Sequence, residues 1–256
     1  RQPGAPLRPG FNLFSQEQDI QLGREAAAEV RKQVDVVENS ELQSYIAELG
    51  SRLSRNPDAG AYPYSFTLVN DPTLNAFALP GGPVFVHTGI LAAAENEAQL
   101  AGVMAHEISH VALRHGTNQA SKANIAQLPA VLAGAAVGQG STLAQLAQLG
   151  IGLGFNSLLL KYSRDAEREA DSLGAHLMAQ AQYNPIEMAR FFEKLEAEGG
   201  SRAPDFLSSH PSPGNRVKNV EAEIRTLPAS SYTEGTGRLA RMKALVSQLP
   251  PPRKRS

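Results

Sequence analysis

The sequence predicts an α+β fold that is mainly helical and contains one small β-sheet. Long segments with apolar residues at helical spacing occupy both ends of the chain. Between them, short runs rich in Val, Phe and Tyr are separated by Asn-Asp-Pro and Pro-Gly-Gly-Pro, which is typical of strands joined by turns. A chain of 256 residues can bury a sizeable core as one elaborated domain or two small ones. We expect a flexible lead-in over residues 1–14, one domain over 15–248 and a basic tail over 249–256.

Charge and cysteine content exclude several function classes. The net charge of −1 implies no broad basic surface, so nucleic acid is not expected as a partner. The chain has no cysteine, which excludes a disulfide framework and a thiol nucleophile. This composition fits an exported protein that needs no oxidative folding. The Pro/Gly-rich opening contains no secretory signal, and we expect a leader to have been removed before it.

Two helices are expected first. One runs from about Ser15 to Val34, with Ser15 as N-cap and acidic residues in its early turns. The second, Glu41 to Leu53, ends before Asn56 and Pro57.

Three strand candidates follow, and their short length predicts a small sheet packed on the next helix. If one of these strands lies at the sheet edge, its free backbone groups can pair with an extended peptide. The candidates are Tyr64–Val69, Asn75–Leu79 and Val84–His87.

The most informative motif is H-E-x-x-H at residues 106–110, inside a proline-free helix expected from Glu95 to His115. That helix is apolar around most of its circumference, which predicts burial. Residues four apart share a helix face, so His106 and His110 can converge on one ion, and Glu107 lies about 100° further round, beside the open metal position. Burying these groups is costly unless they are paired or bind a metal. The motif predicts zinc-dependent hydrolysis.

Two histidines leave a catalytic zinc one protein ligand short. The metzincin pattern is absent, because it requires Gly and His where this chain has Leu113 and Gly116; His115 misses the position by one residue and is expected to point elsewhere. A second amphipathic helix, from Ser163 to about Gln180, offers Glu167 at the border of its apolar face. Asp171 lies one turn further on nearly the same face and is suited to hydrogen-bond a ligating histidine.

Four motifs together, NAFALPGG, HEISH, SRDAEREAD and SHPSPGNR, resemble peptidase family M48 in composition and order. The resemblance implies a zincin-like (gluzincin) core in which the H-E-x-x-H helix packs on the small sheet. It implies one zinc per chain with His106, His110 and Glu167 as ligands, Glu107 as catalytic base and Asp171 as a supporting residue.

The resemblance also implies roles outside these two helices. It assigns substrate binding to the strand near Gly81 to Val86, with Gly81, Gly82, Val84 and Val86 as candidate contacts. A His-Pro loop lies close to the zinc in this family, so His210 is expected either to stabilise the oxyanion or to cap the metal in a resting state. Arg216 is expected to brace that loop.

An uncharged segment over residues 123–160 separates the two metal motifs. Its apolar runs are too short to span a bilayer, which favours a helical hairpin or loop near the active site. A surface that touches a membrane or an outer-membrane protein is the alternative. Downstream, Asn184-Pro185 begins a helix that ends near Glu198, and two further helices are expected after residue 216, without a repeat array.

These features predict a zinc-dependent endopeptidase that cleaves unfolded or misassembled proteins and is exported to the periplasm of a bacterium. The alternatives are a chaperone-like peptide binder with latent protease activity and a zinc amidase acting on cell-wall peptides. A purely structural zinc site is disfavoured because such sites are usually cysteine-rich.

Overall fold

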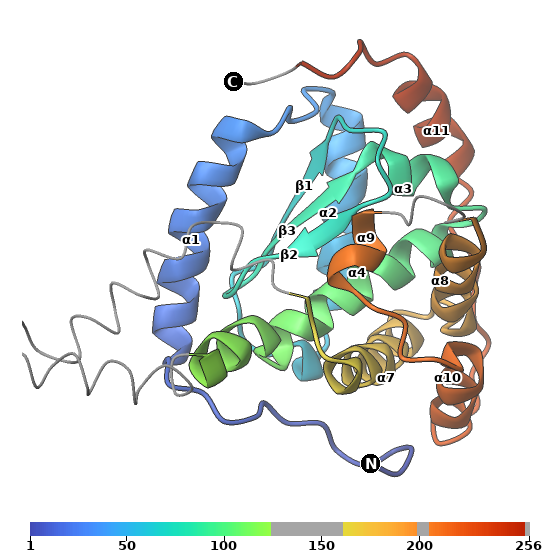
Figure 1. Cartoon of the computed structure of the whole chain (residues 1–256). Coiled ribbons are helices and arrows are strands. Elements are labelled where there is room, and N and C mark those ends of the chain that lie inside the picture. The colour runs from blue at the N-terminus through green and yellow to red at the C-terminus, as the bar shows by residue number, and fades with distance from the viewer. Residues whose placement is uncertain (124–160, 199–204, 254–256) are drawn as a thin grey trace, which may run out of the picture.

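The computed structural model describes residues 1–123, 161–198 and 205–253. Helices dominate this part of the chain, and a three-stranded sheet lies beside α1 (Figure 1). The predicted mainly helical α+β class is confirmed. The named elements, in chain order, are α1 Gln16–Gln33, α2 Ser40–Ser54, the short 3₁₀ helix Pro57–Ala59, β1 Ser65–Val69, β2 Ala76–Ala78, β3 Pro83–His87, α3 Thr88–Ala93, α4 Glu97–Ala112, α7 Arg164–Gln180, α8 Ile186–Glu198, α9 Asp205–Ser209, α10 Arg216–Ile224 and α11 Leu239–Ser247.

Side-chain caps fix where the helices begin. At α1 the Ser15 hydroxyl accepts from the Gln18 backbone N–H, and the Gln18 side chain accepts from the Ser15 N–H, which forms a complete capping box. The side chains of Asn39, Asn96 and Ser163 each accept one backbone N–H at the starts of α2, α4 and α7. Each cap satisfies a backbone donor that would otherwise lack a partner at the helix start.

The sheet has the strand order β1-β3-β2, with β1 parallel and β2 antiparallel to β3. Side chains alternate between the two faces of β3. Val84 and Val86 point into the main core with α2 and α4, whereas Phe85 packs on the opposite face with Val30 of α1. The sheet is therefore covered on both faces, and β3 is paired along both edges.

Helix α4 is the centre of the domain, with every residue from Glu97 to Val111 buried. Its neighbours α7 and α8 approach it closely where glycines leave room. A Cβ atom on Gly102 of α4 would lie 2.6 Å from the Met188 Cβ of α8, and one on Gly174 of α7 would lie 3.4 Å from the His106 backbone nitrogen. These contacts bring α7 against the H-E-x-x-H turn.

The end of α4 differs from the predicted helix, which was expected to continue to His115. The helix stops at Ala112, and Arg114 adopts a left-handed backbone conformation with φ of 57°. Left-handed backbone is unfavourable for a side chain with a Cβ, by about 1 kcal/mol, and persists where contacts hold it. Here the Arg114 side chain bonds Asp19 Oδ2 and the Phe14 carbonyl, both at 2.6 Å.

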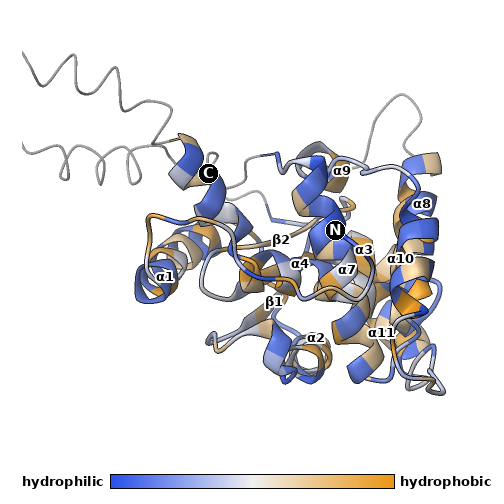
Figure 2. Cartoon of the chain, turned by 90° about the horizontal axis from the view of Figure 1, so that it is seen from below, coloured by the Kyte–Doolittle hydropathy of each residue, from blue (hydrophilic) through white to orange (hydrophobic). Residues whose placement is uncertain are grey.

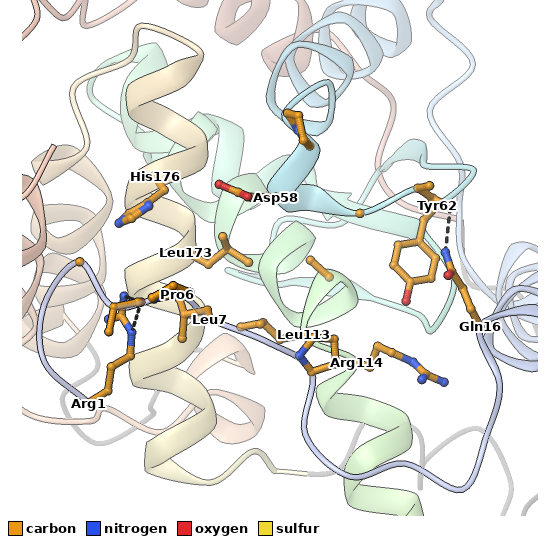
Figure 3. Close-up of a pocket in the computed structure, with 17 residues that line it drawn as sticks. Arg1, Pro6, Leu7, Gln16, Asp58, Tyr62, Leu113, Arg114, Leu173 and His176 are labelled. Carbon is orange, nitrogen blue, oxygen red and sulfur yellow. Dashed lines mark hydrogen bonds between the residues drawn. The ribbon is translucent and has the colours of Figure 1, made fainter. Parts of the chain in front are cut away.

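Residues 1–14 contain no helix or strand but are bonded to the domain. The Arg1 guanidinium pairs with Glu223 of α10, and the Leu13 N–H donates to the Ser121 hydroxyl. The segment borders a cavity of about 660 Å³, whose lining includes Leu7, Leu173 and His176 (Figure 3). No residue of the H-E-x-x-H motif lines this cavity.

Two short helices were not predicted, because α3 and α9 span only six and five residues and carry no readable periodicity. In Figure 2, α1 and α2 each carry both hydrophilic and hydrophobic residues, as expected of helices with one buried face. Within the described ranges, no helix combines the length and apolar character needed to cross a membrane. The predicted hairpin and membrane or partner contact over 123–160 fall on residues 124–160, outside the described part of the chain.

Candidate metal centre

The two histidines of α4 lie on one face of the helix, one turn apart. Both rings are buried, and the two Nε2 atoms are 3.0 Å apart. Two adjacent imidazole nitrogens at this distance must share a proton or a metal ion, because two lone pairs repel each other.

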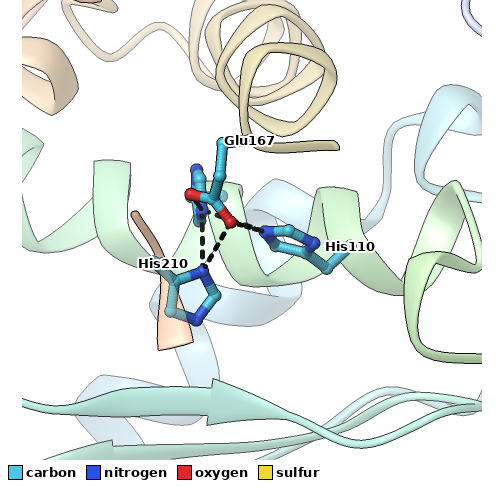
Figure 4. Close-up of side chains that lie close together, drawn as sticks. His110, Glu167 and His210 are labelled. Carbon is cyan, nitrogen blue, oxygen red and sulfur yellow. Dashed lines mark hydrogen bonds and ion pairs between the residues drawn. The ribbon is translucent and has the colours of Figure 1, made fainter. Parts of the chain in front are cut away.

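Glu167 of α7 completes the approach from the neighbouring helix. Its Oε2 lies 3.3 Å from His106 Nε2, and its Oε1 lies 3.4 Å from His110 Nε2. The loop after α9 adds His210, whose Nδ1 lies 3.1 Å from Glu167 Oε1 and 3.3 Å from His106 Nε2. In Figure 4, Glu167 points from α7 toward α4, and the rings of His110 and His210 turn toward its carboxylate.

The spacing of these four side chains fits a tetrahedral ion. Their potential ligand atoms all lie within 4.8 Å of one another, and the close pairs are 3.0–3.4 Å apart. Donors bonded at about 2.0–2.1 Å with tetrahedral angles are separated by about 3.3 Å. A cluster of nitrogen and oxygen donors with this spacing suits Zn²⁺.

Hydrogen bonds on the outer side of the cluster aim its lone pairs inward. Asp171 Oδ1 lies 3.0 Å from His106 Nδ1 and can only accept, so Nδ1 carries the proton and Nε2 presents its lone pair. On the His210 ring, Nδ1 faces Glu167, and Nε2 lies 3.4 Å from Glu107 Oε1. This second set of contacts fixes ring orientation as expected around a metal site.

Arg216 lies behind the carboxylates at the start of α10. Its Nη2 is 2.9 Å from Glu167 Oε2, its Nε is 2.9 Å from Asp171 Oδ2, and its guanidinium lies over the Phe192 ring. The side chain is buried, so the guanidinium is held between the two carboxylates with little freedom to move. Arg216 thus braces the acidic groups of α7. The sequence predicted instead that Arg216 braces the His-Pro loop.

Glu107 lies beside the cluster and outside it. Its carboxylate accepts a hydrogen bond from the backbone N–H of Ala78, while Oε1 has no hydrogen-bond partner among the described residues. Burial raises the pKa of Glu107, although His210 and His106 oppose the rise. A buried carboxylate with one free oxygen and a raised pKa is suited to exchange a proton with a molecule placed next to it.

The charges of the cluster favour a cation. Burial opposes ionisation of Glu167, but His210 and His106 outweigh it and hold the pKa of Glu167 well below its usual range. Burial also disfavours the charged form of His106, yet Glu167 and Asp171 raise the pKa of His106 to about 9. Burial lowers the pKa of His110 well below its usual value. The group therefore combines an ionised carboxylate with His110, which burial keeps neutral, while His106 holds a proton that a bound metal ion would displace.

All residues predicted for the metal site thus meet in one place, and His115, which was not expected to be a ligand, lies outside the group of metal donors. Its Nδ1 lies 2.9 Å from His110 Nδ1, because the turn at Arg114 redirects the chain. Glycine often marks the end of a helix, and Gly116 was the sequence signal for the end of α4. Tyr162, also missed, stacks on the His110 ring at a centroid distance of 4.0 Å, and no sequence pattern indicated that contact.

The predicted substrate strand also needs correction. Val84 and Val86 lie on β3, the central strand, with buried side chains and with β1 and β2 paired on either side. Gly81 and Gly82 are buried, and a Cβ on Gly81 would meet the backbone of Ile20 in α1. An extended peptide therefore cannot pair with this segment. The strand next to Glu107 is β2, whose Ala78 N–H points away from β3.

Comparison with known proteins gives consistent matches. The model of peptidase family M48 matches residues 38–224. The beta-barrel assembly-enhancing protease of Escherichia coli (strain K12) is 33% identical over 213 residues, which cover 79% of this chain and 43% of that protein. The mitochondrial metalloendopeptidase OMA1 of Schizosaccharomyces pombe is 34% identical over 197 residues, which cover 74% of this chain and 57% of that protein. The chain thus spans about half the length of these relatives.

Proposed function

Because this chain belongs to peptidase family M48, a family of metallopeptidases, we propose that it is a zinc-dependent endopeptidase that hydrolyses peptide bonds in unfolded or misassembled proteins. The observation that carries the proposal is the convergence of His106, His110, Glu167 and His210 in the interior, next to Glu107. Other zinc chemistry is less well supported, since the relatives described above are named as proteases or endopeptidases. Neither a chaperone-like binder nor a cell-wall amidase is favoured.

In this proposal the zinc ligands are His106, His110 and Glu167. Asp171 orients the His106 ring, and Arg216 fixes the carboxylates of Glu167 and Asp171. When bound, zinc supplies Lewis acidity, which polarises the scissile carbonyl and makes water easier to deprotonate. Glu107 accepts a proton from the attacking water while the water oxygen forms a bond to the carbonyl carbon. Glu107 then delivers that proton to the amine as the C–N bond breaks.

The substrate backbone is proposed to lie along β2 rather than β3. The edge of β2 that faces away from β3 carries the outward backbone groups of Ala76 and Ala78, and the Ala78 N–H already contacts Glu107. A peptide paired with this edge would have its scissile bond beside Glu107.

A hydrolysis assay tests the proposed function. The purified chain should release new amino termini from an unfolded protein, lose this activity after chelation and recover it on addition of zinc. Absence of cleavage by the zinc-loaded chain, with an unfolded protein or with short peptides, would contradict the function. A peptide with N-methylated amides at the positions that pair with β2 serves as the matched control, and equal cleavage of both peptides would contradict the role of that edge.

His210 is proposed to occupy the fourth corner of the cluster in a resting state. Its Nδ1 is as close to Glu167 and His106 as the other donors are to one another, and its ring stacks on Phe206 at a centroid distance of 4.3 Å. A catalytic zinc needs this corner for water. A substrate must then displace His210 before hydrolysis begins.

The variant His210→Ala should therefore cleave peptides faster than the unmodified chain, by about 10-fold, with unchanged zinc content. A tenfold gain corresponds to removal of about 1.4 kcal/mol of resting-state stabilisation. His176→Ala is the matched control, because His176 pairs with Glu223 on the outer side of α7. A lower rate in His210→Ala at full zinc content would contradict the resting-state role and support oxyanion stabilisation.

Export to the periplasm remains part of the proposal and is supported by the name of the Escherichia coli relative, which refers to β-barrel assembly. Contact with outer-membrane proteins through residues 123–160 is proposed on the same basis. Fractionation of cells that express the full gene product would test both, and recovery in the cytoplasmic fraction alone would contradict them.

A further inference from the structure

The two histidines of the H-E-x-x-H motif have different partners on their outer nitrogens. His106 Nδ1 donates directly to the buried Asp171 carboxylate. His110 Nδ1 instead faces His115 Nδ1 at 2.9 Å, and the other nitrogen of His115, Nε2, lies 3.1 Å from Glu169 Oε2. The Glu169 side chain is 46% exposed, so this second chain of contacts ends at solvent.

The direction of each hydrogen bond in this chain follows from the carboxylate at its outer end. An ionised carboxylate can only accept, so His115 Nε2 donates its proton to Glu169. In neutral His115 the remaining nitrogen, Nδ1, then has a lone pair and accepts from His110 Nδ1–H. His110 is left with its Nε2 lone pair directed at Glu167 and His106. A single arrangement of protons satisfies the whole chain.

We propose that His115 and Glu169 are positioning residues that hold His110 in the tautomer and orientation required for metal binding. This inference rests on the proposed function, in which His110 is a zinc ligand. Asp171 fixes the His106 ring through one hydrogen bond, and His115 together with Glu169 fixes the His110 ring in the corresponding way.

The backbone supports this arrangement at a specific point. In an uninterrupted helix, residues five apart point about 140° away from each other, so His115 would face away from His110. The left-handed Arg114 redirects the chain, and its side chain is held by Asp19 and Phe14. Tyr162 stacks on the His110 ring from the other direction. The ring of His110 is therefore confined both by a hydrogen bond and by a packed neighbour.

The outer end of the chain opens into a cavity of about 400 Å³. His115, Glu169 and Tyr162 line it together with Lys122 and Lys161. By contrast, the carboxylate that holds His106 is backed by the buried Arg216. The two ligands of one motif thus differ in how firmly they are held, and His110 is the one whose support is accessible from outside.

Zinc affinity measures this role separately from catalysis. The dissociation constant, obtained by competition with a chromophoric chelator, should be about 10-fold higher in His115→Leu than in the unmodified chain, since loss of such outer contacts typically weakens metal binding by about 10–100-fold. His115→Asn places an amide oxygen near the position of Nδ1 and should restore affinity to within about 3-fold. The control His176→Leu removes a different histidine–glutamate pair, between His176 of α7 and Glu223 of α10, and should bind zinc with unchanged affinity.

Equal zinc affinity in His115→Leu and His176→Leu would overturn the inference. The inference would also be overturned if His115→Asn bound zinc as weakly as His115→Leu. If His115→Leu does not fold, the exposed Glu169→Ala replaces it, with an expected weakening of about 3–10-fold that Glu169→Gln reverses. Unchanged affinity in Glu169→Ala would then overturn the inference. Failure of the proposed function gives a different result from failure of this inference. If the proposed function is wrong, the unmodified chain binds no zinc, or His110→Ala binds zinc with normal affinity.

Discussion

Replacement of Glu107 by glutamine is expected to lower kcat by about 10³-fold while the chain keeps one zinc per molecule. Glutamine preserves the size of the side chain and its contact with the Ala78 N–H but cannot take a proton from water. General acid–base groups contribute about 10²–10⁴-fold to rates, and Glu107 is assigned both transfers. Because Glu107 lies outside the group of metal donors, zinc content should not change.

The measurement is a comparison of kcat and of metal content by elemental analysis for the two proteins. Glu95→Gln is the matched control, because the exposed Glu95 side chain pairs with Lys194 just before α4 and lies outside the group of metal donors. Full activity in Glu107→Gln would refute the assigned base. Loss of zinc in that variant would show that Glu107 belongs to the metal ligands.

Replacement of Glu167 by glutamine is expected to weaken zinc binding by about 10³-fold. Zinc held by protein ligands at neutral pH is stabilised by about 10–16 kcal/mol, and loss of the single anionic donor among three removes roughly a third of that. The carboxylate faces His106, His110 and His210 at once, so its loss removes a central contact of the cluster. Activity should fall with the zinc content and should return partly at high zinc concentration.

Asp165→Asn provides the matched control on the same helix, because Asp165 is exposed and pairs with the exposed Arg168. The comparison uses chelator competition for affinity and thermal unfolding of the metal-free proteins for stability. Arg216 still has Asp171 as a partner in the variant, so the metal-free protein should remain folded. Zinc affinity equal to that of Asp165→Asn would exclude Glu167 as a ligand.

The sequence predicted the elements of this fold well where local rules decide them. Ser15 and Ser163 mark helix starts because their hydroxyls satisfy backbone donors, and this effect depends on only a few neighbouring residues. The spacing of His106 and His110 is likewise a property of one helix turn. Glu167 could be selected because the apolar face of its helix restricts which carboxylate points inward.

Strand order could not be predicted, because alternation shows which side chains share a face but not which strands are neighbours. The sequence therefore left open that β3, rather than β2, is central, and that β3 lacks the free edge on which the predicted pairing with a peptide depends. The left-handed Arg114 was equally hidden, since its stability comes from Asp19 and Phe14, about a hundred residues earlier in the chain. The contact between His115 and His110 was consequently not predicted.

The guanidinium of Arg216 offsets part of the negative charge of this interior. Glu107, Glu167 and Asp171 bring three carboxylates into a region shielded from water, and Arg216 offsets one of them. Unbalanced charge is strongly unfavourable at low dielectric constant. With all three carboxylates ionised and the imidazoles neutral, a divalent ion would bring the region to electroneutrality, whereas a monovalent ion such as sodium would leave it one charge short.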